Sequence, residues 1–153
     1  MGYDVRVETV AENRPLAIVR RRASLGELPK VVPEACGVVW KVVRARGIAG
    51  AGRHVAVYLD DEINLEVGVE VEGPVAGDGE VVGSELPAGT VATTTHFGPY
   101  GRLGEAHQAV RDWCGKNGYA LAGVNWEVYG HWVAEWERDP SGIRTEVFYL
   151  LAR

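Results

Sequence analysis

Residues 46–58 read RGIAGAGRHVAVY, and residues 117–129 read NGYALAGVNWEVY. The second residue of each stretch, Gly47 or Gly118, is suited to end a helix. The last five residues of each stretch, 54–58 and 125–129, have the alternating side chains typical of a strand. A further pair of similar stretches follows, because residues 64–67 read NLEV and residues 144–147 read RTEV. A run of apolar residues at helical spacing precedes each copy. The order strand, helix, strand, strand is therefore predicted to occur twice.

The chain is expected to form a single domain over residues 1–153, with internal repeats at about residues 14–73 and 88–153. Two strand-helix-strand-strand (SHS2) modules related by a pseudo-twofold axis can share one antiparallel sheet. We therefore expect an α+β fold with two helices on the sheet and a central ligand cleft. The first helix is expected to begin near Pro33, because proline lacks an amide hydrogen, and to end before Gly47.

Composition places the chain among ordinary globular proteins. Hydrophobic residues make up 46% and charged residues 24%, and 16 basic against 21 acidic residues give a net charge of −5. The acidic balance provides no general attraction to nucleic acid or to an anionic membrane, so neither is expected as a direct partner. Residues 1–10 lack the pattern of a signal peptide, and no apolar run approaches the roughly 18 residues that span a bilayer. A cytoplasmic protein is therefore expected.

Cysteine and histidine usage argues against a bound metal. Cys36 and Cys114 lie far apart in two helical patterns, without a CxxC motif or a Cys/His cluster, and we interpret both as reduced thiols. The acidic turn at residues 60–62 is interpreted as solvated. His107, on the core face of the second predicted helix, is interpreted as a core residue with satisfied ring nitrogens. No metal and no cofactor are expected.

Alternation along the strands assigns side chains to the two faces of the sheet. Apolar residues are expected to pack beneath the helices: Val55, Val57, Leu59, Leu65, Val67, Val69, Trp126, Val128, Val147 and Tyr149. The opposite sides, expected to curve into the shared cleft, would then carry His54, Ala56, Tyr58, Glu66, Gly68, Glu70, Glu127, Tyr129, His131, Glu146 and Phe148. A solvated sheet face is the alternative.

Carboxylates and aromatic rings are thereby predicted to share one cleft. Rings offer flat apolar area and cation–π attraction, and a carboxylate neutralises positive charge, so hydrophobic or cationic aromatic small molecules are the expected partners. Three tryptophans without a place in the apolar faces could form the rim. The predicted ligand-binding residues are Trp40, Tyr58, Glu66, Gly68, Glu127, Tyr129, Trp132, Trp136, Glu146 and Phe148.

Residues 96–106, HFGPYGRLGEA, resemble the GPY-x-x-LGEA signature that opens the second helix of GyrI-like domains. Residues 117–123 resemble the NGY-x-x-AG link that follows it. Residues 126–129 are similar to the W-E-x-Y strand of the family, and residues 144–147 to its R-T-E-x strand. Residues 64–68, NLEVG, extend the resemblance into the first half of the chain.

This resemblance implies the effector-binding fold of BmrR-type and Rob-type regulators, here as a stand-alone member without their helix-turn-helix. It implies binding of lipophilic, often cationic drugs and dyes at an acidic residue in an aromatic cleft, and thus multidrug binding or sequestration that gives toxin resistance. By motif match, Glu127 and Glu146 occupy the acidic positions, whereas Glu66 rests mainly on the internal repeat.

Two alternatives stay open. Some stand-alone members of the family are similar to hydrolases that open the cyclopropane ring of DNA-alkylating natural products. In such an enzyme Glu127 and Glu146 would be the catalytic candidates, because a carboxylate whose pKa is raised by burial can activate water as a base. The family name also suggests a separate protein partner, gyrase, although the chain has no acidic run long enough to mimic DNA.

Overall fold

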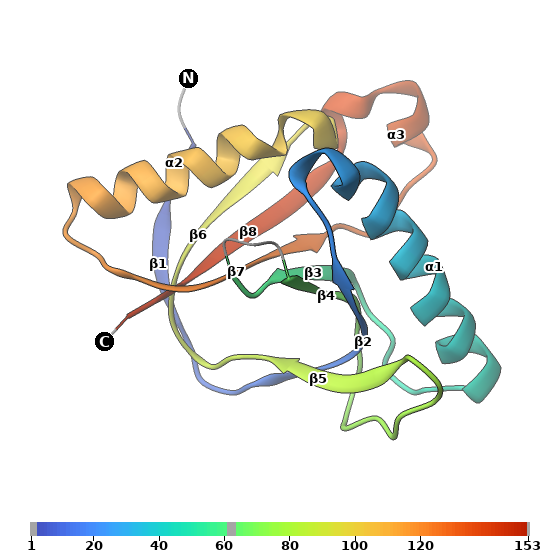
Figure 1. Ribbon diagram of the computed structural model, residues 1–153. Helices are drawn as coiled ribbons and strands as arrows, with labels where there is room; N and C mark the ends of the chain where they lie inside the picture. Colours follow the sequence, from blue (N-terminus) through green and yellow to red (C-terminus); the bar gives the residue numbers. More distant parts are fainter. Residues whose placement is uncertain (1–2, 61–63, 153) are drawn as a thin grey trace.

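Eight antiparallel strands form one curved sheet in the computed structural model, which describes residues 3–60 and 64–152 (Figure 1). Part of the acidic turn at residues 60–62 lies outside the described residues. The helical segments are η1 (Leu25–Glu27), α1 (Leu28–Arg46), η2 (Tyr100–Arg102), α2 (Leu103–Lys116), α3 (Glu135–Arg138) and η3 (Pro140–Gly142). The strands are β1 (Arg6–Val10), β2 (Arg14–Arg22), β3 (His54–Tyr58), β4 (Asn64–Glu70), β5 (Val82–Leu86), β6 (Gly89–Phe97), β7 (Leu121–Tyr129) and β8 (Arg144–Leu151).

The order of the strands is symmetric about the centre of the sheet. Across the sheet it runs β1-β6-β8-β7-β3-β4-β2-β5, with every neighbouring pair antiparallel. Outward from the boundary between β7 and β3, one half reads β7, β8, β6 and the other β3, β4, β2. Along the chain these are β2-α1-β3-β4 and β6-α2-β7-β8. The predicted α+β fold of two modules on one antiparallel sheet is confirmed.

The first helix begins earlier than predicted. It starts at Leu28, with Pro29 in its first turn, where a missing amide hydrogen breaks no helical hydrogen bond. Pro33 lies inside the helix, so the prediction that the helix begins near it is wrong. The end is as predicted, because α1 stops at Arg46 and Gly47 follows in the left-handed region with φ 60°.

Both helices cover the same side of the sheet, here called the helix face. Leu65, Val67 and Val69 pack in one core cluster with α1, and Val147 and Tyr149 in another with α2. The cross-strand partners of Val67 and Val147 fall on this face as well, so it is continuous across the sheet. The predicted faces of β4 and β8 are confirmed.

The predicted faces of β3 and β7 are wrong. Val55 and Val57 pack with Trp126 and Val128 on the opposite side, here called the concave face. That face has its own apolar core, because the curved sheet brings residues of β2 and β5 together with those of β6 (Figure 1). The central strands are thus buried on both sides, and an apolar residue there does not mark the side of the helices. Leu59, 40% exposed, lies beyond the end of β3.

Within the described residues, no helix is long and apolar enough to cross a membrane. α1 and α2 instead carry their apolar stripes against the sheet, as surface helices of a globular domain do.

An exposed glycine on α1 allows a simple test of the helix. A Cβ added at Gly37 would meet no atom within 4 Å. We expect Gly37→Ala to stabilise the protein by about 0.5–1 kcal/mol, because alanine loses less backbone entropy than glycine when a helix forms. Chemical denaturation measures the difference, and a destabilised variant would contradict the assignment of this position to an exposed helix surface.

Candidate functional site

Glu127 lies near the middle of the sheet, on β7, with its side chain on the helix face. Only 5% of this residue is exposed. Its partners across the sheet are Ala56 on β3 and Val147 on β8, and both are fully buried. A carboxylate removed from water in this way requires hydrogen bonds or an opposite charge.

Three side chains surround that carboxylate. The hydroxyls of Tyr58 and Tyr129 donate hydrogen bonds to its Oε1, at 3.0 and 2.6 Å. Its Oε2 lies 2.6 Å from Nε2 of His107 on α2. Burial, and then the negative charge of Glu127, raise the pKa of both tyrosines, so that both hydroxyls stay protonated as donors.

His107 continues the hydrogen bonds outward. Its Nδ1 lies 2.7 Å from the hydroxyl of Tyr149 on β8. Arg111, one turn further along α2, donates to the same hydroxyl at 2.8 Å and is itself exposed. A continuous chain of hydrogen bonds therefore joins a guanidinium at the surface to the buried carboxylate. We define the Glu127 cluster as Glu127, Tyr58, Tyr129, His107 and Tyr149.

Tyr129 links this cluster to both helices and to the surface. Its ring packs against the core clusters of α1 and of α2. It also meets the ring of Tyr100 edge-on, with centroids 5.7 Å apart, and Tyr100 is 45% exposed. Cys36 of α1 packs against the same core cluster, and burial raises the pKa of its thiol to about 11. Tyr129 thus contacts both the Glu127 carboxylate and the partly exposed ring of Tyr100.

Glu146 lies on the concave face and not beside Glu127. Its Oε1 accepts a hydrogen bond from Arg53 at 2.6 Å. The same guanidinium donates to Glu70 at 3.2 Å, and the side chains of Glu70 and Glu146 are 9% and 19% exposed. The expectation that Glu127 and Glu146 share one cleft is therefore wrong, because neighbouring strands carry them on opposite faces.

Glu66 and Gly68 also lie on the concave face, on β4. Glu66 accepts hydrogen bonds from the Ser84 hydroxyl at 2.6 Å and from Arg20 at 3.3 Å. A side chain at Gly68 would overlap the carbonyl oxygen of Ala17 on the neighbouring strand. Both residues contribute to the packing of β4 in the sheet. The prediction that they share a cleft with Glu127 is wrong, because Glu127 lies on the helix face.

The predicted aromatic residues are divided between several places. Phe148 stacks on Trp126 in the concave core, with centroids 5.6 Å apart. Trp40 on α1 is 39% exposed. Trp132 is 52% exposed and meets Trp136 edge-on, with centroids 5.5 Å apart. That the three tryptophans line the rim of a ligand site stays a prediction.

The structure thus brings together Tyr58, Glu127 and Tyr129 from the predicted set. Sequence reasoning missed the contact of His107 with the carboxylate. Its interpretation as a satisfied core histidine is accurate, but the satisfying groups are those of the predicted site. The sequence carries no signal for this contact beyond the position of His107 on the core face of the helix, because its partner Glu127 lies 20 residues away along the chain.

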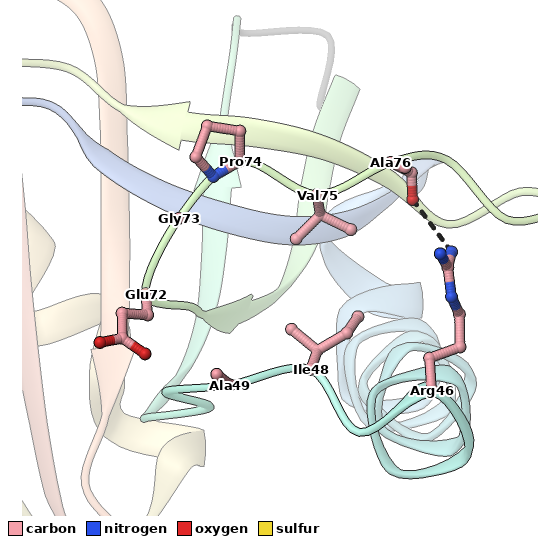
Figure 2. A pocket seen from close by; sticks show the side chains of 8 residues that line it. All are labelled: Arg46, Ile48, Ala49, Glu72, Gly73, Pro74, Val75 and Ala76. Carbon is pink, nitrogen blue, oxygen red and sulfur yellow. Dashed lines mark hydrogen bonds between the residues drawn. The ribbon is translucent and has the colours of Figure 1, made fainter.

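The hollow drawn in Figure 2 lies at the C-terminal end of α1 and contains no residue of the Glu127 cluster. It is open to solvent, and Arg46 donates to the Ala76 carbonyl at 3.2 Å along its edge. About 370 Å³ in volume, the hollow is lined by Arg46, Ile48, Ala49, Glu72, Gly73, Pro74, Val75 and Ala76.

Among the residues that the structure describes, no group of three or more metal-ligating side chains could hold a metal ion.

The ion cluster on the concave face is expected to stabilise the fold. Arg53→Met would leave Glu70 and Glu146 without their guanidinium, and we expect a loss of about 1–2 kcal/mol, since Arg53 is partly exposed and water screens part of the interaction. Arg20→Met is the matched control, because the Arg20 side chain is 67% exposed, and its expected cost is below about 0.5 kcal/mol. Equal unfolding free energies in urea for both variants would contradict this role of Arg53.

Comparison with protein families gives a match over residues 3–149 to the GyrI-like small molecule binding domain. Comparison with curated protein sequences gives no significant match. The family match covers both modules and every residue of the Glu127 cluster.

Solved structures share the fold at low sequence identity. The EcmrR C-terminal domain aligns with a TM-score of 0.80 and 21% identity, over 100% of this chain and 99% of that one. In the EcmrR–DNA complex the match has a TM-score of 0.77 at 20% identity and covers 99% of this chain but 58% of that one. SAV2435 bound to tetraphenylphosphonium aligns at 0.67 and 10% identity, over 99% and 94%. A hydrolase from Listeria innocua aligns at 0.62 and 10% identity, over 99% and 93%.

Proposed function

This chain belongs to the GyrI-like small-molecule-binding family, and we propose that it binds lipophilic, often cationic aromatic molecules at the Glu127 cluster. SAV2435, which shares the fold, is bound to tetraphenylphosphonium in its solved structure. A permanent organic cation of that kind is the simplest probe of the proposed site.

The observation that carries the proposal is a buried carboxylate without a permanent positive partner. Within the described part of the chain, the only ion pair of Glu127 is with His107, which is charged only when protonated. Every other acidic side chain that we find largely buried, on the concave face, is paired with an arginine. A buried negative charge left without arginine or lysine favours a cationic ligand as its partner.

The rings around Glu127 suit the same class of ligand. Tyr58, Tyr129 and Tyr149 come from three different strands and lie within one hydrogen-bonded cluster. Aromatic faces attract organic cations and provide apolar contact area at little cost in side-chain entropy. Burial raises the pKa of each of these tyrosines, so that none competes with Glu127 as a second negative charge.

A ligand would reach Glu127 by moving the side chains above it. α1 packs mainly on β2 and β4, and α2 mainly on β6 and β8, so each helix belongs to its own half of the sheet. α1 and α2 can therefore move apart to admit a ligand while each helix keeps its contacts with its own strands. Tyr100, half exposed and in contact with Tyr129, is the first ring that such a ligand would displace.

The direct test compares two ions of the same shape and opposite charge. Calorimetric titration with tetraphenylphosphonium and with tetraphenylborate separates the contribution of charge from that of apolar area. We expect the cation to bind at least about a hundredfold more tightly, because the anion would face a buried carboxylate. Equal affinities would contradict a charge-selective site, and failure of both ions to bind would contradict the proposed function.

Hydrolysis is the second candidate, favoured by the 2.6 Å contact between the Glu127 carboxylate and an imidazole. Glu127 would remove a proton from water as the water oxygen bonds to a carbon of a cyclopropane ring. The ring C–C bond breaks, its electron pair moves to the electron-accepting group that activates the ring, and a proton joins that group. Glu127 would supply that proton from the one it removed, and His107 would hold the carboxylate in place through its Nε2 contact.

Turnover distinguishes this candidate from binding alone. A cyclopropane-bearing alkylating agent would be incubated in large excess over the protein, and the ring-opened product followed by mass spectrometry. Multiple turnovers that disappear in Glu127→Gln would support hydrolysis. Product limited to one equivalent of protein, or equal turnover in the variant, would exclude Glu127 as the catalytic base.

A further inference from the structure

Among residues 3–60 and 64–152, His107 is the titratable group that forms an ion pair with Glu127 when it is protonated. Its side chain is 12% exposed and that of Glu127 7%, so the pair is largely withdrawn from water. Imidazole is the side-chain group whose ordinary titration falls between about pH 5 and 8. The protonation state of His107 therefore decides whether the cluster offers a ligand a net negative charge or none.

The hydrogen bonds around His107 specify one tautomer of the neutral imidazole. Arg111 donates to the oxygen of Tyr149, since a guanidinium has no acceptor. The single hydroxyl proton of Tyr149 can then point to Nδ1 of His107, which must accept it. The ring proton is left on Nε2, where it points to the carboxylate of Glu127. In this assignment each of the three hydrogen bonds, from Arg111 to Tyr149, from Tyr149 to His107 and from His107 to Glu127, has one donor and one acceptor.

Protonation of His107 would break this order. With hydrogens on both ring nitrogens, the Tyr149 oxygen would receive hydrogen bonds from Arg111 and from His107 at once. The Tyr149 hydroxyl proton would then lose its acceptor in a residue that is only 5% exposed.

The charged and titratable groups that face His107 come from each element packed around it. They are Glu127 and, through its carboxylate, Tyr129 on β7; Tyr149 on β8; Tyr58 on β3, whose ring lies edge-on at 6.3 Å; and Arg111 on α2 itself. Cys114 of α2 lies near Tyr149 and Cys36 of α1 near Tyr129, both as protonated thiols, because burial raises the pKa of both. Glu127 is the only anion of the group and Arg111 the only permanent cation.

We propose that His107, which Tyr149 and Arg111 orient with its ring proton on Nε2, competes with an organic cation for the Glu127 carboxylate when the ring is protonated, so that cation binding under acidic conditions releases a proton. This inference rests on the proposed function. A monovalent organic cation binds the form in which Glu127 is charged and His107 neutral. Protonated His107 occupies the place of the cation's charge, so that protons and organic cations compete for one carboxylate.

The sign of the pH dependence follows from this competition. Affinity for a permanent cation is highest where His107 is fully neutral and falls on acidification, by up to about tenfold per pH unit below the midpoint of the imidazole titration. Affinity for a neutral aromatic ligand of similar shape does not follow the same curve, because it gains nothing from the charge of Glu127.

The experiment is a series of calorimetric titrations of the full chain with tetraphenylphosphonium between pH 5.5 and 8.5. The charge of this ligand does not change with pH, so any slope comes from the protein. His107→Gln places an amide N–H where Nε2–H stood and cannot titrate, and we expect its affinity to be flat across the range. Arg111→Gln frees the Tyr149 oxygen to accept from a protonated ring, and we expect the midpoint of its profile to move to higher pH. His131→Gln, an exposed histidine outside the cluster, should keep the profile of the unmodified chain.

Each outcome decides between the two proposals. A flat profile in the unmodified chain, or an unchanged slope in His107→Gln, would overturn the role of His107 while cation binding itself stands. A midpoint that does not move in Arg111→Gln would overturn the hydrogen-bond chain as the cause. Absence of tetraphenylphosphonium binding even at pH 8.5 would overturn the proposed function and this inference with it. Nitrogen NMR of His107 in the ligand-free chain tests the Nε2–H tautomer separately, and the Nδ1–H form would contradict it.

Discussion

Glu127→Gln is expected to weaken the binding of tetraphenylphosphonium by about 30- to 150-fold, or about 2–3 kcal/mol. The substitution keeps the shape of the side chain and removes its charge. Tyr58 and Tyr129 can still donate to the amide oxygen that replaces Oε1, and His107 accepts from the amide NH2 that replaces Oε2 once its ring proton moves to Nδ1. The loss therefore reports the attraction between the carboxylate and the cation together with this change of tautomer. Calorimetric titration at pH 8 measures it, with circular dichroism to show that the fold is retained.

Glu146→Gln is the matched control for that variant. The sequence places Glu146 in a motif as similar to the family pattern as that of Glu127. The structure places it on the concave face, bound to Arg53. We expect its affinity for tetraphenylphosphonium to stay within about twofold of the unmodified chain. A loss in Glu146→Gln that equals or exceeds the loss in Glu127→Gln would move the charge-bearing site to the concave face.

The second large effect is structural. Gly68→Ala is expected to destabilise the protein by more than about 3 kcal/mol or to prevent folding, because its methyl group would overlap the backbone of Ala17 and Ile18 on β2. Backbone atoms within a sheet cannot move aside without loss of strand pairing. The yield of folded protein and the midpoint of urea unfolding, both without ligand, measure the effect.

Gly37→Ala serves as the control, since it makes the same chemical change where no atom lies in the way. The comparison also separates two interpretations of Gly68. A residue that only contacts ligand would leave the unfolding midpoint unchanged and alter affinity. A variant Gly68→Ala with the stability of the unmodified chain would show that β2 and β4 do not approach each other as described.

The repeat made the architecture predictable from sequence. Two short pairs of similar stretches, at residues 46–58 with 117–129 and at residues 64–67 with 144–147, predicted the duplicated order of elements, and the sheet is symmetric about the boundary between them. The alternation of β4 and β8 also predicted the correct faces. In those strands a glutamate alternates with residues that pack beneath the helices, so polarity and position agree.

The same reasoning failed on β3 and β7, for a physical reason. These strands lie at the centre of the sheet, where the helices cover one side and the curvature of the sheet closes the other. Val57 and Trp126 are buried on the side without a helix, whereas Glu127 is buried on the side with one. The hydrophobic pattern of a strand shows which side chains are buried. It shows which face of the sheet packs against the helices only when the other face is exposed to solvent.

The inversion explains why the candidate site was only partly predictable. Tyr58, Glu127 and Tyr129 stay together because β3 and β7 invert together. Tyr58 and Tyr129 are equivalent positions of the repeat, and Glu127 lies two residues before Tyr129 on the same face of β7. Glu66 and Glu146, equivalent to each other in the repeat, do not invert and are left on the opposite face. His107 could be recognised only from three-dimensional contacts, because its partner Glu127 is 20 residues away along the chain.

A crystal structure of the chain with tetraphenylphosphonium would test the central claim most directly. We predict that the phosphonium lies on the helix face, within about 6 Å of the Glu127 carboxylate and against the rings of Tyr58 and Tyr129, with Tyr100 displaced. A ligand seated on the concave face beside Glu146, or at the end of α1 in the hollow of Figure 2, with the Glu127 cluster unchanged, would contradict it.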